Sequence, residues 1–279
     1  MRLNMARKIV LCGAGFLGAP FVLKFLVNLF AKLVTRLGSS IATAISRANN
    51  SAGVLRRIQV SSRDPHKIFN KLKETLPQDH LLPPIPVDVT KKDTLTEAFL
   101  NADAVVSLVG ILRGSPAQFE AIQWKGAENV ALAAAAVGAK LVHISAIGAD
   151  PHSKIPYTRT KALGEEAVLS YCPNATIVRP SLIFGPGDGL FNVRINQRLE
   201  HVLTLLCWQR FAQLSRYLPL LPVFGDGGTR FQPVYVGDVG QLVEILTRDN
   251  SDLTGNVGTD GRIIEAVGPE SEFSHHSPT

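Results

Sequence analysis

The sequence predicts a doubly wound α/β domain, in which helices cover both faces of a parallel β-sheet. Short apolar segments alternate with helix-like segments from residue 7 to residue 180. The apolar segments are nearly continuous, which is the pattern of strands that are buried on both faces. The chain has 279 residues, of which 46% are hydrophobic, and this is enough for a large buried core.

Six strands are expected, at residues 7–12, 57–62, 85–89, 103–109, 140–144 and 175–178. Helix-like segments at 67–76, 119–137 and 161–171 lie between several of them. This alternation is typical of parallel strands joined by helices that cross back over the sheet. After Pro180 the pattern weakens into Gly- and Pro-rich sequence. We therefore expect one α/β domain at 1–189 and a smaller, incomplete region at 190–279.

A glycine-rich loop, GAGFLG at 13–18, directly follows the first expected strand. In this position the spacing GxGxxG indicates a Rossmann-type site for a nicotinamide dinucleotide. Gly13 permits a tight turn, Gly15 lets a pyrophosphate approach the backbone, and Gly18 lets the helix pack on the strand. The helix start faces the phosphates. We expect Phe16 and Leu17 to line the same site.

The end of the second expected strand selects the cofactor. An acidic residue there would bind the ribose 2′-hydroxyl of NAD, but this chain has Ser61, Ser62 and Arg63. A guanidinium group grips a 2′-phosphate with paired hydrogen bonds. Although Asp64 follows one position later, the sequence favours NADP(H) over NAD(H).

Two further strand ends contribute to the predicted cofactor site. Asp88 and Val89 end the third strand, where the carboxylate would meet the adenine amino group. The alternative, which stays open, is that Asp88 belongs to the start of the next helix. Leu108, Val109 and Gly110 end the fourth strand, and they predict an apolar wall that the cofactor approaches closely.

Ser145, Tyr157 and Lys161 form the predicted catalytic group. Tyr157 and Lys161 are four residues apart at the start of a helix, so their side chains share one face. In a redox site, the lysine charge lowers the pKa of the tyrosine and holds the nicotinamide ribose. The tyrosine then exchanges a proton with the substrate, and Ser145 orients the carbonyl. Lys161 is therefore also expected to bind the cofactor.

These motifs resemble the extended or atypical short-chain dehydrogenases/reductases. The resemblance rests on the glycine motif, the SxxG-like residues 145–148, YxxxK at 157–161 and Arg179-Pro180. It narrows to the family of the alpha-subcomplex subunit 9 of mitochondrial NADH:ubiquinone oxidoreductase (complex I). That step rests on the runs VVSLVGIL (105–112), LVHISAIGAD (141–150), YTRTKALGEEAV (157–168), IVRPSLIFGPGD (177–188) and TRFQPVYVGDV (229–239).

The resemblance implies a mitochondrial protein on the matrix side of the inner membrane that holds NADPH as a structural cofactor. It implies partners in an inner-membrane complex, either complex I or proteins of ubiquinone synthesis. Members of this family keep the Tyr–Lys pair without an established turnover. Three functions therefore stay open: a non-catalytic NADP(H)-binding subunit or assembly partner, an active NADPH-dependent oxidoreductase or epimerase, and a truncated product without stable function.

Two segments depart from the family pattern. Residues 19–38 interrupt the joint between the glycine loop and its helix, and joining Gly18 to Ser39 would restore that joint. Removing residues 193–209 would likewise restore the family pattern. Both segments preserve the reading frame, and the second begins and ends with residues whose codons carry intron-border letters. Retained introns and lineage-specific elements are the two interpretations.

Segment 19–38 also predicts an unusual helix. Lys24, Asn28, Lys32 and Arg36 recur at every fourth position of a mostly apolar sequence. Because charges at this spacing are costly inside a bilayer, we expect no transmembrane span. A helix lying at a membrane surface and a helix that binds a protein partner stay open.

Charge and cysteine content narrow the partners further. The net charge is +6, yet no acidic residue precedes Asp64, whereas ten basic residues do. The basic character belongs to the N-terminal quarter, so we expect no nucleic-acid partner. An acid-free start containing Arg and Ser resembles organelle-targeting sequence, and the alternative is a basic phosphate-binding half-domain. Three distant cysteines without a Cys/His cluster predict neither a metal site nor a disulfide framework.

Overall fold

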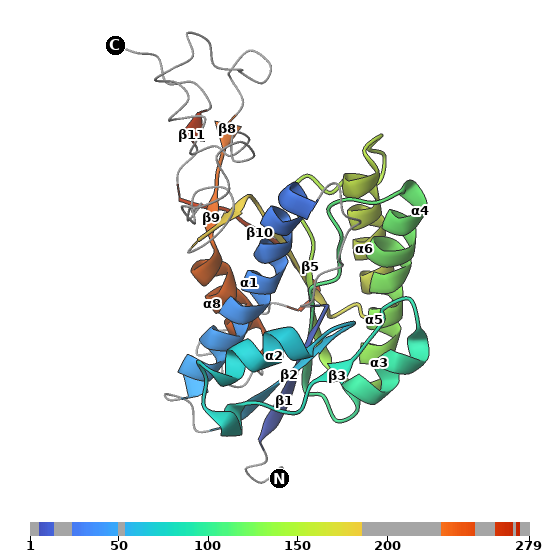
Figure 1. The fold of residues 1–279 in the computed structure, drawn as a ribbon. Coiled ribbons are helices and arrows are strands. Elements are labelled where there is room, and N and C mark those ends of the chain that lie inside the picture. Colours follow the sequence, from blue (N-terminus) through green and yellow to red (C-terminus); the bar gives the residue numbers. More distant parts are fainter. Residues whose placement is uncertain are drawn as a thin grey trace, which may run out of the picture.

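Seven parallel strands form the central sheet (Figure 1). The computed structural model describes residues 6–13, 24–49, 54–185, 230–248, 260–269 and 272–273. Across the sheet the order is β10, β6, β5, β4, β1, β2, β3, and all neighbours run parallel. The strands are β1 (Arg7–Cys12), β2 (Arg56–Ser62), β3 (Ile85–Pro86), β4 (Ala104–Ser107), β5 (Lys140–Ile144), β6 (Thr176–Pro180) and β10 (Ile263–Ala266). The predicted fold class is confirmed.

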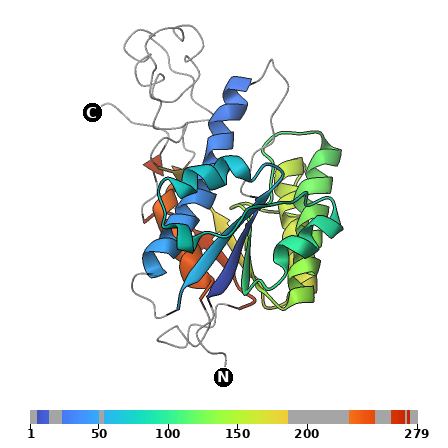
Figure 2. The same cartoon turned by 60° about the horizontal axis from the view of Figure 1, so that its bottom comes forward.

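Helices cover both faces of this sheet (Figures 1 and 2). One face carries α1 (Lys24–Asn49), α2 (His66–Lys73), the short helix η2 (Gln78–His80) and α8 (Val236–Leu246). The other face carries α3 (Lys92–Phe99), α4 (Pro116–Phe119), η3 (Glu120–Trp124), α5 (Lys125–Val137) and α6 (Pro156–Tyr171). The helices α4, η3 and α5 follow one another directly, and η3 is a single π-helical turn.

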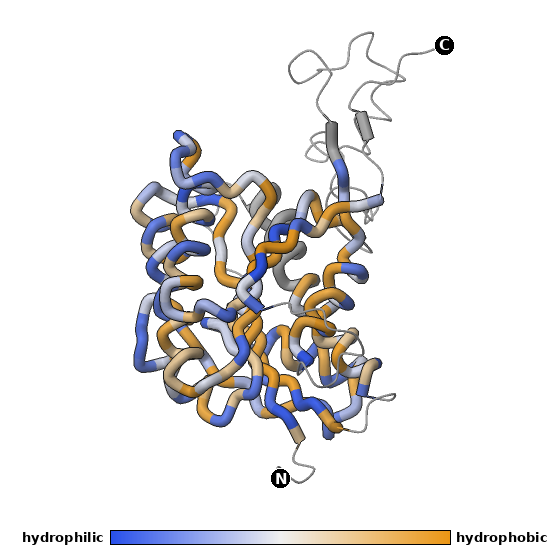
Figure 3. Tube along the Cα trace, turned by 180° about the vertical axis from the view of Figure 1, so that it is seen from behind, coloured by the Kyte–Doolittle hydropathy of each residue, from blue (hydrophilic) through white to orange (hydrophobic). Residues whose placement is uncertain are grey.

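Successive strand residues point into two separate cores. In β1, Ile9 and Leu11 face the core under α1, whereas Val10 and Cys12 face the core under α5, and all four are fully buried. A strand with both faces buried needs apolar residues at every position, which explains the continuous apolar runs of the sequence. Figure 3 shows these hydrophobic strand segments at the centre of the molecule.

All six expected strands are present, and the bounds of several differ from the expected ones by one to three residues. β3 ends at Pro86, and β4 ends at Ser107, so Val89 and Leu108 lie in the loops that follow rather than in the strands. Two small sheets add to the main one: β7 (Ile183–Phe184) pairs with β9 (Val234–Tyr235), and β8 (Arg230–Phe231) pairs with β11 (Glu272–Phe273). Val89 and Leu108, in these two loops, are among the predicted site residues.

Beyond residue 189, one strand extends the main sheet and one helix packs on a helix that covers it. β10 pairs with β6, and α8 packs against α1. The two helices approach closely: Ser40 Oγ donates to the backbone oxygen of Val236 at 3.0 Å, and a Cβ atom on Gly240 would lie 2.7 Å from Ser40 Oγ. The division into two domains at residue 189 stays a prediction.

Helix α1 runs without interruption from Lys24 to Asn49. It therefore joins most of segment 19–38 to the helix that the sequence places after Ser39. Leu37, Ile41 and Ile45 are buried against the sheet. Among the described residues, no helix is both long and apolar enough to cross a membrane. Segment 193–209 lies outside the described residues.

A buried ion pair fastens α8 to the amino end of the sheet. Nη2 of Arg56, at the start of β2, lies 2.6 Å from Oε1 of Glu244, and each side chain is only 5% exposed. Arg248 donates two further hydrogen bonds to the same carboxylate. The Asn49 side chain binds the backbone of Arg56 twice: its amide nitrogen donates to the Arg56 carbonyl oxygen, and its amide oxygen accepts from the Arg56 N–H. This network connects α1, β2 and α8.

Glu244→Ala should lower the free energy of unfolding by about 3–5 kcal/mol, because it leaves Arg56 buried without its anion. Urea denaturation followed by circular dichroism measures the loss. Glu128→Ala is the control, since its partner Lys125 is 56% exposed and such pairs contribute less than about 1 kcal/mol. Equal losses in the two variants would contradict the buried anchor.

Candidate functional site

The carboxyl ends of β1 and β4 flank the crevice in which doubly wound sheets bind their ligands. From β1 the chain moves to β2 and β3 on one side, and it then returns to β4, β5 and β6 on the other side. The strand order reverses between β1 and β4, and this switch point opens a crevice at their carboxyl ends. Most of the predicted site residues come from the segments that follow strands of this sheet, while Tyr157 and Lys161 lie on helix α6.

Gly13 closes this edge directly after β1. Its φ of +85° is one that L side chains rarely adopt, and a Cβ atom there would lie 3.2 Å from the carbonyl carbon and oxygen of Leu108. The Gly13 N–H donates to the Ser61 oxygen at 2.7 Å, and the Leu108 N–H donates to the Cys12 oxygen at 2.8 Å. The turn therefore needs glycine on two grounds, and its contact with a pyrophosphate stays a prediction.

The rest of the glycine motif, Gly15, Phe16, Leu17 and Gly18, lies outside the described residues. Helix α1 begins at Lys24, which puts its N-terminus about 20 Å from Ser39 at 1.5 Å per residue. The free N–H groups of a helix lie in its first turn. In this chain those groups are therefore far from Ser39, where the sequence predicts the phosphate-binding helix to start.

The end of β2 presents the residues expected to choose the cofactor. The Ser62 hydroxyl is buried and has no hydrogen-bond partner in the described part of the chain. Arg63 is exposed, partial burial lowers the pKa of its guanidinium group, and the charge of Asp88 opposes that effect. Arg63 and Asp88 therefore lie close enough at this edge to interact electrostatically.

The carboxylate of Asp88 is used within its own turn. Its Oδ1 accepts hydrogen bonds from the N–H of Thr90 at 3.0 Å and from the Thr90 hydroxyl at 2.8 Å. Partial burial acts to raise the pKa of Asp88, but these bonds and the charges of Arg63 and Lys91 lower it overall. Asp88 thus forms the turn before the next helix, and its contact with adenine stays a prediction. The Val89 side chain packs beside Gly126 of α5.

Lys161 is the best-defined group of the site. It is 5% exposed, and its Nζ donates at 3.0 Å to the backbone oxygens of both Val109 and Ile144. Burial lowers the pKa of Lys161 to about 8, and the charge of Glu165 acts in the opposite direction. A Cβ atom on Gly110 would lie 3.2 Å from Nζ. Lys161 therefore holds together the loop after β4 and the end of β5.

Tyr157 and Ser145 lie on the two elements that Lys161 joins. Tyr157 is one turn before Lys161 on α6, its ring packs edge-on against Phe119, and burial raises its pKa. Ser145 follows β5, and its N–H donates to the Val178 oxygen at 2.7 Å. Its hydroxyl is buried and makes no hydrogen bond within the described ranges. The catalytic roles of the three residues stay predictions.

Two buried polar side chains beside Lys161 were not predicted from the sequence to belong to the site. Gln123, on the π-helical turn η3, donates to the Thr160 hydroxyl at 3.0 Å, and its Oε1 has no partner in the described part of the chain. His143 Nδ1 lies 3.0 Å from the Ser107 hydroxyl. Burial and the Lys161 charge lower the pKa of His143 to about 3, so it is neutral. For His143 the available signal was a polar residue within an otherwise apolar part of β5.

The family described as NAD dependent epimerase/dehydratase matches residues 36–258. The chain belongs to the NAD-dependent epimerase/dehydratase family. The match begins after the glycine motif and after most of segment 19–38, and it includes the buried half of α1. The cofactor is therefore a nicotinamide dinucleotide, NAD(H) or NADP(H).

The epimerase/dehydratase chain is similar to two mitochondrial proteins. It is 31% identical over 196 residues to NADH dehydrogenase (ubiquinone) 1 alpha subcomplex subunit 9 of Arabidopsis thaliana, which is 69% of this chain and 43% of the relative. It is 29% identical over 191 residues to the NADH-ubiquinone oxidoreductase 40 kDa subunit of Neurospora crassa, covering 67% and 43%. The predicted resemblance is confirmed, and the chain spans less than half the length of these relatives.

A solved structure shares the fold. The UDP-glucuronic acid 4-epimerase of Bacillus cereus, in complex with NAD, superposes with a TM-score of 0.62 at 19% identity. The superposition covers 96% of this chain and 80% of the epimerase. It supports the doubly wound architecture of the epimerase/dehydratase chain.

The described residues fit the two ends of a dinucleotide. Ser62 leaves a buried hydroxyl at the adenosine end, while Ser145 leaves one near the nicotinamide end, and Lys161 supplies a charge beside it. Buried polar groups without partners in a crevice are suited to a polar ligand. When bound, the nicotinamide ring supplies hydride transfer. Lys161 would hold the ribose, and the wall from Leu108 to Gly110 would exclude water.

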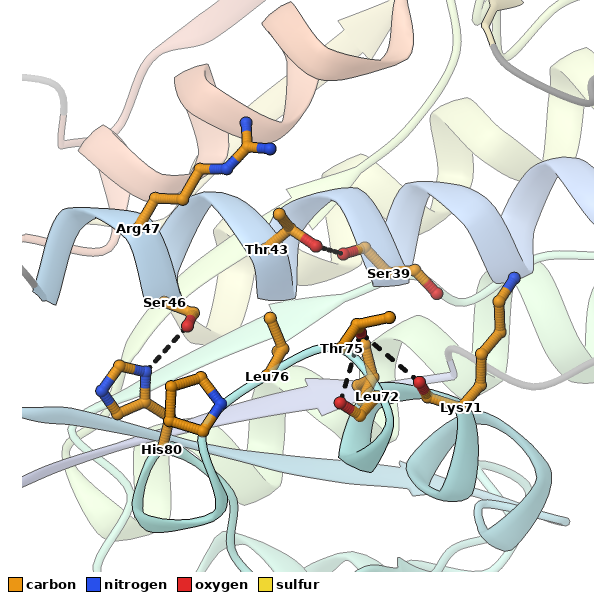
Figure 4. Close-up of a pocket in the computed structure, with 10 residues that line it drawn as sticks. Ser39, Thr43, Ser46, Arg47, Lys71, Leu72, Thr75, Leu76 and His80 are labelled. Atoms are coloured by element: carbon orange, nitrogen blue, oxygen red, sulfur yellow. Dashed lines mark hydrogen bonds between the residues drawn. The ribbon is translucent and has the colours of Figure 1, made fainter.

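A groove of about 470 Å³ lies away from this crevice, between α1, α2 and η2 (Figure 4). Its hydroxyl groups already have partners within the fold: Thr43 donates to the Ser39 oxygen, Thr75 donates to backbone oxygens of α2, and Ser46 pairs with His80. The groove contains none of the predicted site residues.

Removing residues 19–38 joins Gly18 to Ser39 and moves the helix start to the carboxyl edge of the sheet. The shortened chain should be more soluble and should bind NADPH about tenfold more tightly, the effect of one hydrogen bond to a charged group. Free N–H groups would then face the pyrophosphate. A titration that follows NADPH fluorescence measures the affinity.

Removal of 193–209 alone is the control and should not raise the affinity. Sequencing of transcripts gives an independent check, because the commonest mRNA should lack the codons for 19–38. Weaker NADPH binding after removal of 19–38, with its codons present in all transcripts, would make the segment a genuine element of the protein.

Proposed function

We propose that this chain is an NADP(H)-binding protein of the complex I accessory-subunit type, on the matrix side of the mitochondrial inner membrane. The cofactor is a structural group, and the protein contributes to the assembly or stability of the complex or to ubiquinone metabolism. Two lines of support are the similarity to mitochondrial subunits of that complex and the polar groups of the crevice that Lys161 holds together.

The pKa of the Tyr157 phenol is the main support for a structural rather than a reacting cofactor. A tyrosine that exchanges a proton with a substrate needs a pKa close to the working pH. Here burial raises the pKa of Tyr157, and the Phe119 ring packs against it. A phenol whose pKa is raised gives up its proton less readily and is a poorer partner for proton exchange with a substrate, which supports a structural cofactor.

The end of β2 supports NADP(H) as the preferred form. Arg63 stands where an acidic residue would bind the ribose hydroxyl of NAD. Before it stands Ser62, whose hydroxyl has no hydrogen-bond partner among the residues that the structure describes. A 2′-phosphate would accept hydrogen bonds from both, and it would compete with Asp88 for the guanidinium charge.

A second candidate is an active NADPH-dependent oxidoreductase or epimerase. The observation that favours it is the buried hydroxyl of Ser145, which lacks a partner among the described residues and is available to a substrate carbonyl. In that function Ser145 orients the carbonyl, Tyr157 donates a proton to its oxygen, and the Lys161 charge assists.

Arg63→Glu tests the cofactor preference. The unmodified protein should bind NADPH more tightly than NADH, and the variant should lose about 10–100-fold in NADPH affinity, because charge-assisted hydrogen bonds to the 2′-phosphate are removed. Isothermal titration calorimetry with both nucleotides measures this. Arg57→Glu, on the exposed side of the same strand, should leave the preference in place. Equal affinities of the unmodified protein for both nucleotides would refute it.

Tyr157→Phe separates the two candidate functions. For a structural cofactor, NADPH affinity should change by less than about twofold, which is under 0.5 kcal/mol, and assembly of the complex should be unchanged. For an enzyme, NADPH oxidation with added quinones or carbonyl compounds should disappear. Tyr171→Phe, at the exposed end of α6, is the matched control. An activity that is lost in Tyr157→Phe but kept in Tyr171→Phe would show that the protein is an enzyme and contradict a structural cofactor.

A further inference from the structure

A second buried charge lies one helical turn beyond Lys161. Glu165 occupies position i+4 on α6, where side chains share a face, and its side chain is only 4% exposed. Arg179 of β6 binds it in a bidentate manner. Nε donates to the two carboxylate oxygens at 2.9 and 3.2 Å, and Nη2 donates to Oε2 at 2.7 Å.

The groups around Lys161 divide clearly by charge. On α6 itself, Tyr157 is protonated, while from β5 His143 is neutral. Glu165 lies one turn beyond Lys161 on α6, and Arg179 of β6 forms an ion pair with it. Beyond it, Glu265 of β10 lies 3.8 Å from Arg179 but is 55% exposed, so water screens its charge. Among these described residues, Glu165 is thus the buried carboxylate on the same helix as the ammonium group.

A buried ammonium group needs such an anion. Its hydrogen bonds to Val109 and Ile144 reach neutral carbonyl oxygens, which do not offset the loss of hydration of a full charge. A carboxylate on the same helix face favours the charged lysine. Arg179 in turn forms a bidentate ion pair with Glu165, and a guanidinium group in this geometry stabilises a carboxylate. The charges therefore alternate from Lys161 through Glu165 to Arg179.

We propose that Glu165, held by Arg179, is a positioning residue that keeps Lys161 protonated at neutral pH. The ammonium group then remains anchored on the two strand ends and available to the hydroxyl groups of a bound ribose. This inference rests on the proposed function only for the ribose contact. The protonation of Lys161 is a property of the protein without ligand and is tested there.

The test measures the titration of Lys161 in the full chain by NMR of lysine labelled with ¹³C at the ε-carbon, with Lys161→Arg to assign the signal. Without the nearby anion, the charged lysine is less stable, so Glu165→Gln should shift the titration midpoint to lower pH. The shift should be about one unit, a tenfold change in proton affinity. Glu166→Gln, a change at the exposed neighbour, should leave the midpoint unchanged.

Glu165→Asp keeps the charge and serves as the conservative variant, so its midpoint should stay near that of the unmodified chain. If the glutamine variant does not fold, Glu165→Ala removes the same charge and should shift the midpoint to lower pH in the same way. The inference is overturned if Glu165→Gln leaves the midpoint in place, if Glu166→Gln shifts it equally, or if Glu165→Asp shifts it as far as expected for glutamine.

NADPH titrations of the same samples over pH distinguish this inference from the proposed function. Affinity should fall as Lys161 loses its proton, at lower pH in Glu165→Gln than in the unmodified chain. A chain that binds no NADPH but shows the predicted NMR shift keeps the role of Glu165 and refutes the proposed function.

Discussion

The buried ammonium group of Lys161 joins the parts of the crevice that have to stay together. Its hydrogen bonds reach the backbone after β4 and at the end of β5, while its own backbone belongs to α6. A buried charge that loses its partners costs several kcal/mol, so the two strand ends and the helix cannot separate freely. Tyr157, one turn earlier on α6, is placed beside the crevice by the same contacts.

The close packing around this group explains two residues that otherwise have no evident purpose. Gly110 leaves room for Nζ, because a Cβ atom there would lie 3.2 Å from it. Gly164 lets α6 approach the π-helical turn, since a Cβ atom there would lie 2.6 Å from the Gln123 oxygen. This π-helical turn holds Gln123 against Thr160. Such π-helical turns occur frequently at functional sites.

The two halves of the crevice differ in how they are held. The half expected to hold the nicotinamide is tied by buried polar contacts to β4, β5 and α6. The half expected to hold the pyrophosphate depends on the start of the first helix, and α1 begins at Lys24, well before the buried residues that pack on the sheet. We therefore expect cofactor affinity to depend on how Gly13 is joined to this helix.

Local patterns allowed most of the sheet, and the placement of Tyr157 and Lys161 one turn apart on a helix, to be predicted from sequence. A strand buried on both faces must be apolar throughout, and a spacing of four residues places two side chains on one helix face. Glu165 has that same spacing from Lys161, but its partner Arg179 comes from β6, so the pair is visible only in three dimensions.

Other features depended on long-range packing. The place of β10 beside β6 and of α8 on α1 follows from contacts such as Arg56–Glu244, which join residues far apart in the chain. Asp88 had two open interpretations; its carboxylate accepts hydrogen bonds within its own turn, and its contact with adenine stays a prediction. A helix over segment 19–38 was expected, and α1 continues it without a break to Asn49, through residues that pack on the sheet.

Hydrogen–deuterium exchange of the full chain, with and without NADPH, tests the location of the cofactor site most directly. A dinucleotide at the switch point should slow exchange in the peptides that contain residues 108–113 and 144–150, at the carboxyl ends of β4 and β5. Exchange in residues 71–80, which line the separate groove, should not change. Protection confined to that groove, or no protection at saturating NADPH, would contradict a dinucleotide site at the carboxyl edge of the sheet.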